Sequence, residues 1–140
     1  MKAVLLVMSL FVTAIACQKP SDDTVPQPTE KNYIGKYKIA KMFFKVTGKP
    51  DQDMIADQPA CAQDDLLSFE ANAIFRYIDA GVSCGDEPEA PTKWSVGGKK
   101  MTIDGVISDI LSFDNKTLVL STPMNMFGIQ GVVEQTLVKQ

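Results

Sequence analysis

Short runs of alternating apolar and polar residues, separated by turn residues, constrain the fold of this chain most. The clearest example is a hairpin over Thr92–Asp104 that turns at Gly97-Gly98, a strong two-residue turn signal. That turn places Trp94 opposite Met101 and puts both on one face of the hairpin. Polar and charged residues occupy the other face, which is the pattern of a sheet with one buried and one wet side.

The same pattern of short alternating runs separated by turn residues recurs along residues 34–139. A turn on Asn115-Lys116 pairs Phe113 with Leu118 and Leu111 with Leu120. The expected strands are Ile34–Val46, Leu66–Glu70, Ala73–Asp79, Thr92–Val96, Lys99–Asp104, Val106–Phe113, Thr117–Ser121 and Gly131–Lys139. Eight strands in sequential hairpins, with almost no helical periodicity, predict an all-β fold, an eight-stranded antiparallel up-and-down barrel, with a strongly curved meander as the alternative.

The start of the chain carries a different pattern. Met1-Lys2 is a short basic start, Ala3–Ile15 is a mostly apolar run, and small residues precede Cys17. This segment resembles a bacterial lipoprotein signal peptide that ends in a lipobox, a family in which the chain is cut before the cysteine and the cysteine is lipidated. The apolar run is short for a membrane span, and a basic start is typical of targeting. An N-terminal anchor helix or a buried core segment is the alternative.

This resemblance implies three parts. They are a signal peptide over residues 1–16, a lipidated flexible tether over residues 17–32, and one globular domain over residues 33–140. The tether holds Pro20, Pro26 and Pro28 among polar residues, a composition that cannot bury a core. The resemblance further implies that acyl chains (palmitate) on Cys17 are the sole membrane anchor. It implies an outer-membrane location, with the domain either periplasmic or surface-exposed.

Two further cysteines, Cys61 and Cys84, remain in the domain. An even pair in an exported protein predicts a disulfide, and a metal site is the alternative. The chain contains no histidine, which excludes Ser-His-Asp and Cys-His catalytic units and histidine ligation. The acidic loop around Asp51 and Asp53 does not match the spacing of an EF-hand. We therefore expect no metal, no cofactor and no enzymatic activity.

The charged residues give no sign of a nucleic-acid site. The chain holds 14 basic and 17 acidic residues, a net charge of −3, and the lysines are spread along it without a basic block. Nucleic-acid binding proteins usually concentrate basic residues on one face. We expect a monomer with no nucleic-acid partner.

Three runs in the domain carry a second resemblance. They are C-A-Q-D-D-L-L-S-F-E-A-N-A-I-F-R-Y from Cys61, T-K-W-S-V-G-G-K-K-M-T-I from Thr92, and I-L-S-F-D-N-K-T-L-V-L from Ile110. Together they resemble the lipocalin-like domain lipoproteins of the Bacteroidetes type, over residues 33–140. The resemblance implies a lipocalin-like barrel, in a family mostly without assigned activity. Tyr37 stands where lipocalins carry a tryptophan, and Lys139 is the candidate for the basic residue that packs on it.

Five residues are candidates for ligand binding. Trp94 stacks on a ligand or, alternatively, packs in the core. Arg76, the only arginine, holds an anionic group or pairs with a carboxylate such as Glu70. Met124, Met126 and Phe127, in an expected connection over residues 123–128, line the mouth of a cavity or close the end of the barrel.

These observations favour a binding protein. A lipid-anchored barrel would hold a small apolar or amphipathic ligand, since an eight-stranded barrel is either filled by side chains or holds one small molecule. The alternative is a non-catalytic surface interaction module with a filled core. An open apolar cavity of a few hundred Å³ would separate the two.

Overall fold

A computed structural model describes residues 28–85 and 89–140. The expected signal peptide, Cys17 and most of the tether lie outside the described residues. A single short helix, α1 (Glu30–Tyr33), and a 3₁₀ turn (Ala71–Ala73) are the helical elements of the described part. The strands are β1 (Gly35–Lys45), β2 (Gln52–Asp53), β3 (Leu66–Glu70), β4 (Ile74–Ile78), β5 (Thr92–Gly97), β6 (Lys100–Ile103), β7 (Val106–Phe113), β8 (Thr117–Met126) and β9 (Ile129–Lys139).

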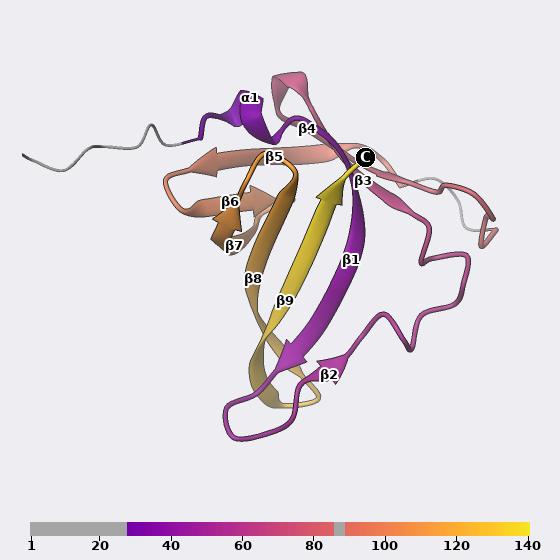
Figure 1. Ribbon diagram of the computed structural model, residues 1–140, viewed down its shortest axis with the longest axis vertical. Helices are drawn as coiled ribbons and strands as arrows, with labels where there is room; N and C mark the ends of the chain where they lie inside the picture. Colours follow the sequence, from indigo (N-terminus) through magenta and orange to yellow (C-terminus); the bar gives the residue numbers. More distant parts are fainter. Residues whose placement is uncertain (1–27, 86–88) are drawn as a thin grey trace, which may run out of the picture.

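The sheet closes on itself. Strands β1, β3 and β4 to β9 follow one another in chain order, every neighbouring pair is antiparallel, and β9 pairs back with β1. The short strand β2 pairs only with the far half of β1 and stands outside this ring (Figure 1). The predicted eight-stranded antiparallel up-and-down barrel is therefore confirmed.

A β-bulge at Ala40 lets β1 serve two parts of the interior. The pairing with β9 shifts between Ile39 and Lys41, so inward positions change from odd to even numbers. Tyr37 therefore points into one part of the core, and Met42 and Phe44 belong to a second cluster with Val133. Figure 1 shows this second part as the lower extension formed by β1, β8 and β9.

A second bulge changes the register of the β7–β8 hairpin. Phe113 pairs with Leu118 as predicted, but the pairing then shifts between Ile110 and Ser112. Ile110, not Leu111, lies opposite Leu120, so the expected Leu111–Leu120 pair is wrong. The extra residue turns the Leu111 side chain outward, where it is exposed.

The β5–β6 hairpin turns one residue later than predicted. Gly97 pairs with Lys100, so Gly98 and Lys99 form the turn, and Trp94 lies opposite Ile103 instead of Met101. Gly98 has a φ of +58°, which suits the first central position of a type II′ turn. Moving a turn by one residue moves the register by two, so the apolar face is unchanged.

The β8–β9 hairpin is longer than predicted. Residues 123–128 do not form a connection, because β8 continues to Met126 and β9 begins at Ile129. Pro123 pairs with Val132 of β9, while β7 pairs with β8 no further than Ser121. Proline is tolerated there because the β7 side of the strand is a free edge that needs no N–H donor.

Candidate ligand cavity

Large side chains fill the end of the barrel that α1 covers. Trp94, Tyr37 and Phe69 are almost fully buried, and Phe69 meets Tyr37 and Trp94 edge-on with ring centroids 5.5 and 5.2 Å apart. Tyr33 of α1 stacks on Phe113 at 4.2 Å. The Tyr37 hydroxyl donates a hydrogen bond to the Tyr33 carbonyl oxygen at 2.9 Å. This end of the barrel is a packed core.

The remaining part of the interior holds a cavity of about 310 Å³. Its lining comes from seven of the eight barrel strands, and most of these side chains are apolar. The lining residues are Ile39, Leu67, Phe75, Tyr77, Ile103, Val106, Ser108, Leu120, Thr122, Met124, Val133 and Gln135. Tyr77, Val106 and Met124 are the exposed members, at 37, 54 and 41%, so they frame the mouth.

The polar groups of the cavity are uncharged. Ser108 and Thr122 lie on facing positions of β7 and β8, and their hydroxyl oxygens are 2.7 Å apart. Ser108 is buried, so this pair satisfies both hydroxyls inside an apolar wall. Gln135 points its amide nitrogen toward the Met42 sulfur at 3.3 Å. The cavity therefore offers hydroxyl and amide groups, but no charge among its lining side chains.

Tyr77 connects the mouth to the neighbouring loops. Burial raises the pKa of its phenol to about 12, and the adjacent Asp65 carboxylate adds to this effect. Asp65 in turn accepts a hydrogen bond from the Ala80 backbone N–H at 3.1 Å. Tyr77 therefore stays protonated to a higher pH than an ordinary tyrosine, whose pKa is about 10.

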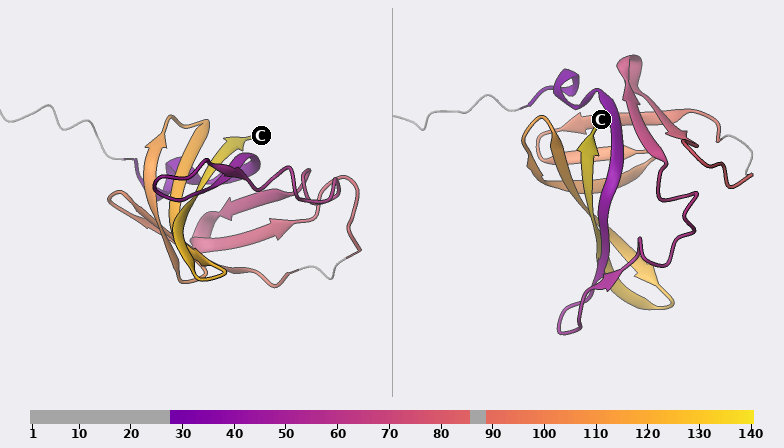
Figure 2. Two further views of the ribbon diagram at one scale, coloured as in Figure 1. Left: turned by 90° about the horizontal axis from the view of Figure 1, so that it is seen from below. Right: turned by 45° about the vertical axis from the view of Figure 1, so that its right-hand side comes forward.

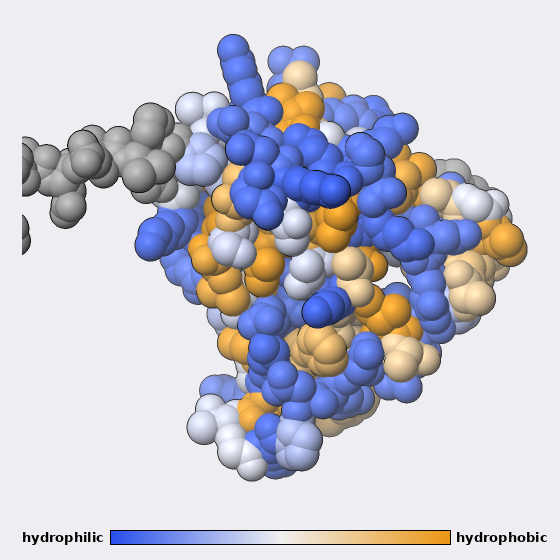
Figure 3. All heavy atoms as spheres, viewed as in Figure 1, coloured by the Kyte–Doolittle hydropathy of each residue, from blue (hydrophilic) through white to orange (hydrophobic). Residues whose placement is uncertain are grey.

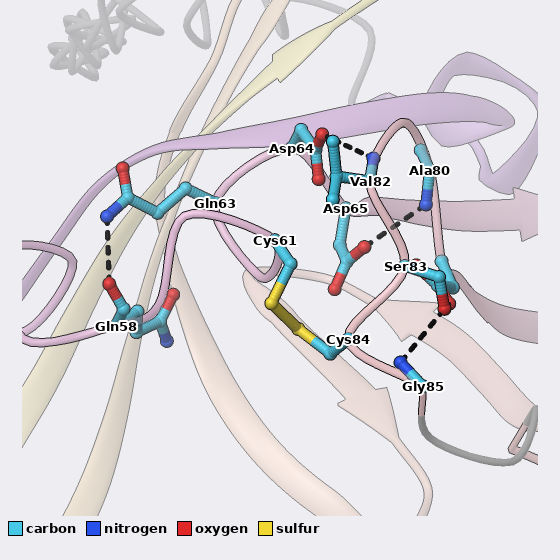
Figure 4. The surroundings of a disulfide bond; sticks show 11 residues. Gln58, Cys61, Gln63, Asp64, Asp65, Ala80, Val82, Ser83, Cys84 and Gly85 are labelled. Carbon is cyan, nitrogen blue, oxygen red and sulfur yellow. Dashed lines mark hydrogen bonds between the residues drawn. A yellow bond between two sulfur atoms is a disulfide. The ribbon is translucent and has the colours of Figure 1, made fainter.

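The predicted disulfide is present between Cys61 and Cys84. It ties the loop before β3 to the loop after β4 (Figure 4). Asp64 strengthens the same junction, because its carboxylate accepts a hydrogen bond from the Val82 backbone N–H at 3.1 Å. The bridge fixes the loops behind Tyr77 rather than contributing to the cavity wall.

Trp94 lies in the packed core and does not line the cavity. It is 1% exposed, and its indole N–H donates to the Glu70 carbonyl oxygen at 3.0 Å. This is the buried position on the apolar face of the hairpin that the sequence pattern predicts, and ligand stacking was the other interpretation.

Arg76 lies on the outer face of the barrel. Its Nε is 3.1 Å from a Glu70 carboxylate oxygen, and both side chains are well exposed. Arg76 therefore forms the cross-strand ion pair with Glu70 and does not lie in the cavity.

The three candidates in the β8–β9 hairpin separate. Met124 lines the cavity, whereas Met126 packs on the second cluster around Met42 and Phe44. Phe127 occupies the hairpin turn and is 98% exposed. We grouped these three residues because the sequence pattern predicted a loop over residues 123–128, where the structure has the ends of two strands and a two-residue turn.

Most of the residues that line the cavity were not predicted from the sequence. Ser108, Thr122 and Gln135 occupy inward positions on β7, β8 and β9, where an apolar residue is the usual choice. The sequence signal for the cavity was the presence of small or uncharged polar residues at inward positions. Inward positions can be assigned only from the correct strand register, which the bulge at Leu111 shifts.

A larger hollow of about 460 Å³ lies outside the barrel. It is bounded by Lys38, Ile39 and Ala40 of β1 and by residues 55–64 of the loop that stands off from it. The outward face of β1 carries Lys36, Lys38 and Lys41, and hydrophilic side chains cover much of this side of the molecule (Figure 3). This hollow is a gap between loop and barrel, and unlike the inner cavity it has charged lining residues, Lys38 and Asp64.

Lys139 packs on Tyr37. The two residues are partners in the β1–β9 ladder, and the Lys139 ammonium lies 5.6 Å from the centre of the Tyr37 ring. Gly35 makes room for this contact, because a Cβ there would lie 2.3 Å from the Lys139 Cε. The same ammonium donates to the Asn32 carbonyl oxygen at 3.2 Å, which ties β9 to α1.

Two further findings concern the described residues. No group of three or more acidic or cysteine side chains gathers in a way that could hold a metal ion. No helix in residues 28–85 and 89–140 is long and apolar enough to cross a membrane.

Comparisons of the chain with protein-family models and with curated proteins find no match.

Proposed function

We propose that this protein is a non-catalytic, lipid-anchored binding protein of the cell envelope that holds one small apolar or amphipathic ligand in its barrel. The observation that carries the proposal is the cavity of about 310 Å³ inside the barrel, lined by inward-facing side chains and open at Tyr77, Val106 and Met124. Ligand sites are usually mostly apolar clefts with a few placed polar groups.

The dimensions and chemistry of the cavity define the ligand class. Its volume is at the lower limit of the usual range of roughly 300–1,000 Å³ for small-molecule sites. Because no lining side chain is charged, the enclosed part of the ligand would be neutral. The Ser108–Thr122 pair would meet a hydroxyl or carbonyl group, and the apolar walls would enclose a hydrocarbon portion.

The packed half of the barrel favours a second candidate. A surface interaction module would need no cavity, and the core around Trp94 and Tyr37 has none. The two functions differ in whether an apolar molecule enters beside Ser108 and Thr122.

An apolar fluorescent probe tests this directly. Energy transfer from Trp94, the only tryptophan, would report a probe inside the barrel. Val106→Phe adds bulk at the mouth, where Val106 is half-exposed, and should weaken probe binding about tenfold or more. Ile107→Phe is the matched control, because Ile107 is similarly exposed but absent from the cavity lining.

Lipid extracts of the envelope should displace the probe. If the folded protein shows no energy transfer with any apolar probe, or if both variants behave alike, the interaction module replaces this proposal.

The anchor is tested separately. The Tyr37–Lys139 contact supports a lipocalin-like kinship, and the segment that ends at Cys17 supports lipidation. Cys17→Ala should abolish acyl labelling and leave an unprocessed precursor or a soluble product. Normal acyl labelling of that variant would exclude Cys17 as the anchor.

A further inference from the structure

The turn of the β8–β9 hairpin presents a fully exposed aromatic side chain. Phe127 is 98% exposed, and Met124 and Ile129 beside it are exposed as well. This tip lies at the lower end of the molecule, as does the loop between β1 and β2, and it is remote from α1 (Figures 1 and 2). Nothing in the packing of the described residues requires a phenylalanine there.

The backbone of the turn disfavours phenylalanine. Phe127 and Gly128 have φ angles of +52° and +81°, between the paired residues Met126 and Ile129. A turn with two positive φ values favours Asn-Gly or Gly-Gly, since a bulky residue in this region is strained. The chain therefore has phenylalanine at a position where both the backbone conformation and the exposure to solvent favour a small or polar residue.

The hairpin also lacks charge. No charged residue occurs between Lys116 and Glu134, although charged residues make up 22% of the chain. Solvent-exposed edges of sheets usually carry charges that prevent unwanted association. Asn125 and Gln130, which pair close to the turn, are exposed but uncharged. A narrow, uncharged tip with Phe127 at its apex fits a surface that needs neither ion pairs nor matching shape.

We propose that the Phe127 tip inserts into a lipid surface. A specific protein–protein interface needs about 800 Å² on each partner, which a two-residue turn does not supply. A lipid bilayer accepts a single apolar wedge at its boundary, and the gain scales with the apolar area that enters. Met124 belongs to both the hairpin and the cavity mouth, so insertion would bring the mouth to the lipid.

Depth-dependent quenching tests the insertion in the full chain. Phe127→Trp places an indole at the tip, and Leu111→Trp places one at an exposed site on β7. In phosphatidylcholine vesicles with brominated acyl chains, the indole of Phe127→Trp should be quenched and blue-shifted. The Leu111→Trp indole should stay near the level of the unmodified protein, in which Trp94 is buried. Equal quenching of both indoles, or none at Phe127→Trp, overturns the proposal.

A second pair of variants separates insertion from folding. With Ile129→Trp as the reporter, Phe127→Asn should lower the ratio of inserted to free tips about tenfold, since burial of a phenylalanine is worth about that factor or more. The unfolding midpoint should stay equal or rise, because asparagine tolerates positive φ. Quenching that disappears at high salt, or a dimer that Phe127→Asn dissociates, would overturn the apolar insertion.

The proposal does not depend on a bound ligand. Val106→Phe should weaken probe binding without changing the quenching at the tip, so failure of one proposal would leave the other standing.

Discussion

Trp94 joins the packed core to the β3–β4 turn through both its ring and its indole N–H. Trp94→Ala should lower the free energy of unfolding by about 3–5 kcal/mol, the usual cost of removing a large buried aromatic residue. Trp94→Phe should cost less, about 1–3 kcal/mol, mainly because the Glu70 carbonyl loses its donor. Denaturant unfolding measures both values. A small loss of stability together with lost probe binding, measured by the fluorescence of the probe itself, would instead identify Trp94 as a ligand contact.

Tyr37 should make the stability of the barrel fall at high pH. Burial raises the pKa of its phenol to about 12, with a smaller contribution from Tyr33, whereas an unfolded tyrosine titrates near 10. Between these values the unfolded chain releases a proton that the folded chain keeps. The stability present below pH 10 is therefore lost as the pH rises to 12, by about 2–3 kcal/mol for this group.

The variant Tyr37→Phe isolates this contribution. It should be less stable at pH 8, by about 1 kcal/mol, because the hydrogen bond to the Tyr33 carbonyl is lost. Its stability should then decline less steeply between pH 10 and 12 than that of the unmodified protein. The raised pKa values of Tyr33 and Tyr77 leave part of the decline in place. Identical slopes for both proteins would contradict the assignment to Tyr37.

At the scale of the strands, Gly131 is fixed by its neighbours. A Cβ there would lie 2.5 Å from the Lys45 carbonyl oxygen and 2.7 Å from the Phe44 ring. Gly131→Ala should therefore lower the free energy of unfolding by about 1–3 kcal/mol, the usual range for overpacking. Gly97→Ala in β5 is the control, since nothing lies within 4 Å of its Cβ position and it should be neutral or slightly stabilising. Thermal unfolding of the two variants measures the difference.

Strand bounds were predictable where turn residues mark them on both sides. The segments Leu66–Glu70 and Val106–Phe113 are strands with the predicted bounds. Registers were less predictable, because a bulge adds one residue without a composition of its own. Ala40 and Leu111 look like ordinary strand residues in the sequence, and only the closed ladder shows that they are extra.

At the scale of the whole molecule, closure of the barrel and the cysteine pair followed from the sequence, but the cavity did not. Which inward positions are filled depends on how the strands are staggered around the ring, and the alternation of one strand does not contain that information. Of the five candidate ligand residues only Met124 lines the cavity. The other four were selected for residue type, which fits a core, an ion pair or an exposed turn equally well.

The closed barrel has one weak junction. Strand β4 joins β5 only through the pairs Ile74–Lys93 and Phe75–Thr92, the shortest ladder among the barrel strands of the described part. The Cys61–Cys84 bridge encloses the β3–β4 hairpin in a loop with a sequence separation of 23 residues. The bridge therefore holds the hairpin that the β4–β5 ladder holds poorly.

Removal of the disulfide should lower the stability of the whole barrel and should also weaken the β4–β5 junction locally. The chain-entropy model gives a loss of about 3–4 kcal/mol for the double variant Cys61→Ala and Cys84→Ala, because the unfolded chain gains freedom. Hydrogen exchange locates the effect. Backbone amides of β4 should exchange faster by a larger factor than those of β8 and β9, which the long β8–β9 and β1–β9 ladders protect. If all amides accelerated by one common factor, the bridge would stabilise the barrel only through the unfolded chain, and the β4–β5 junction would need no support from it.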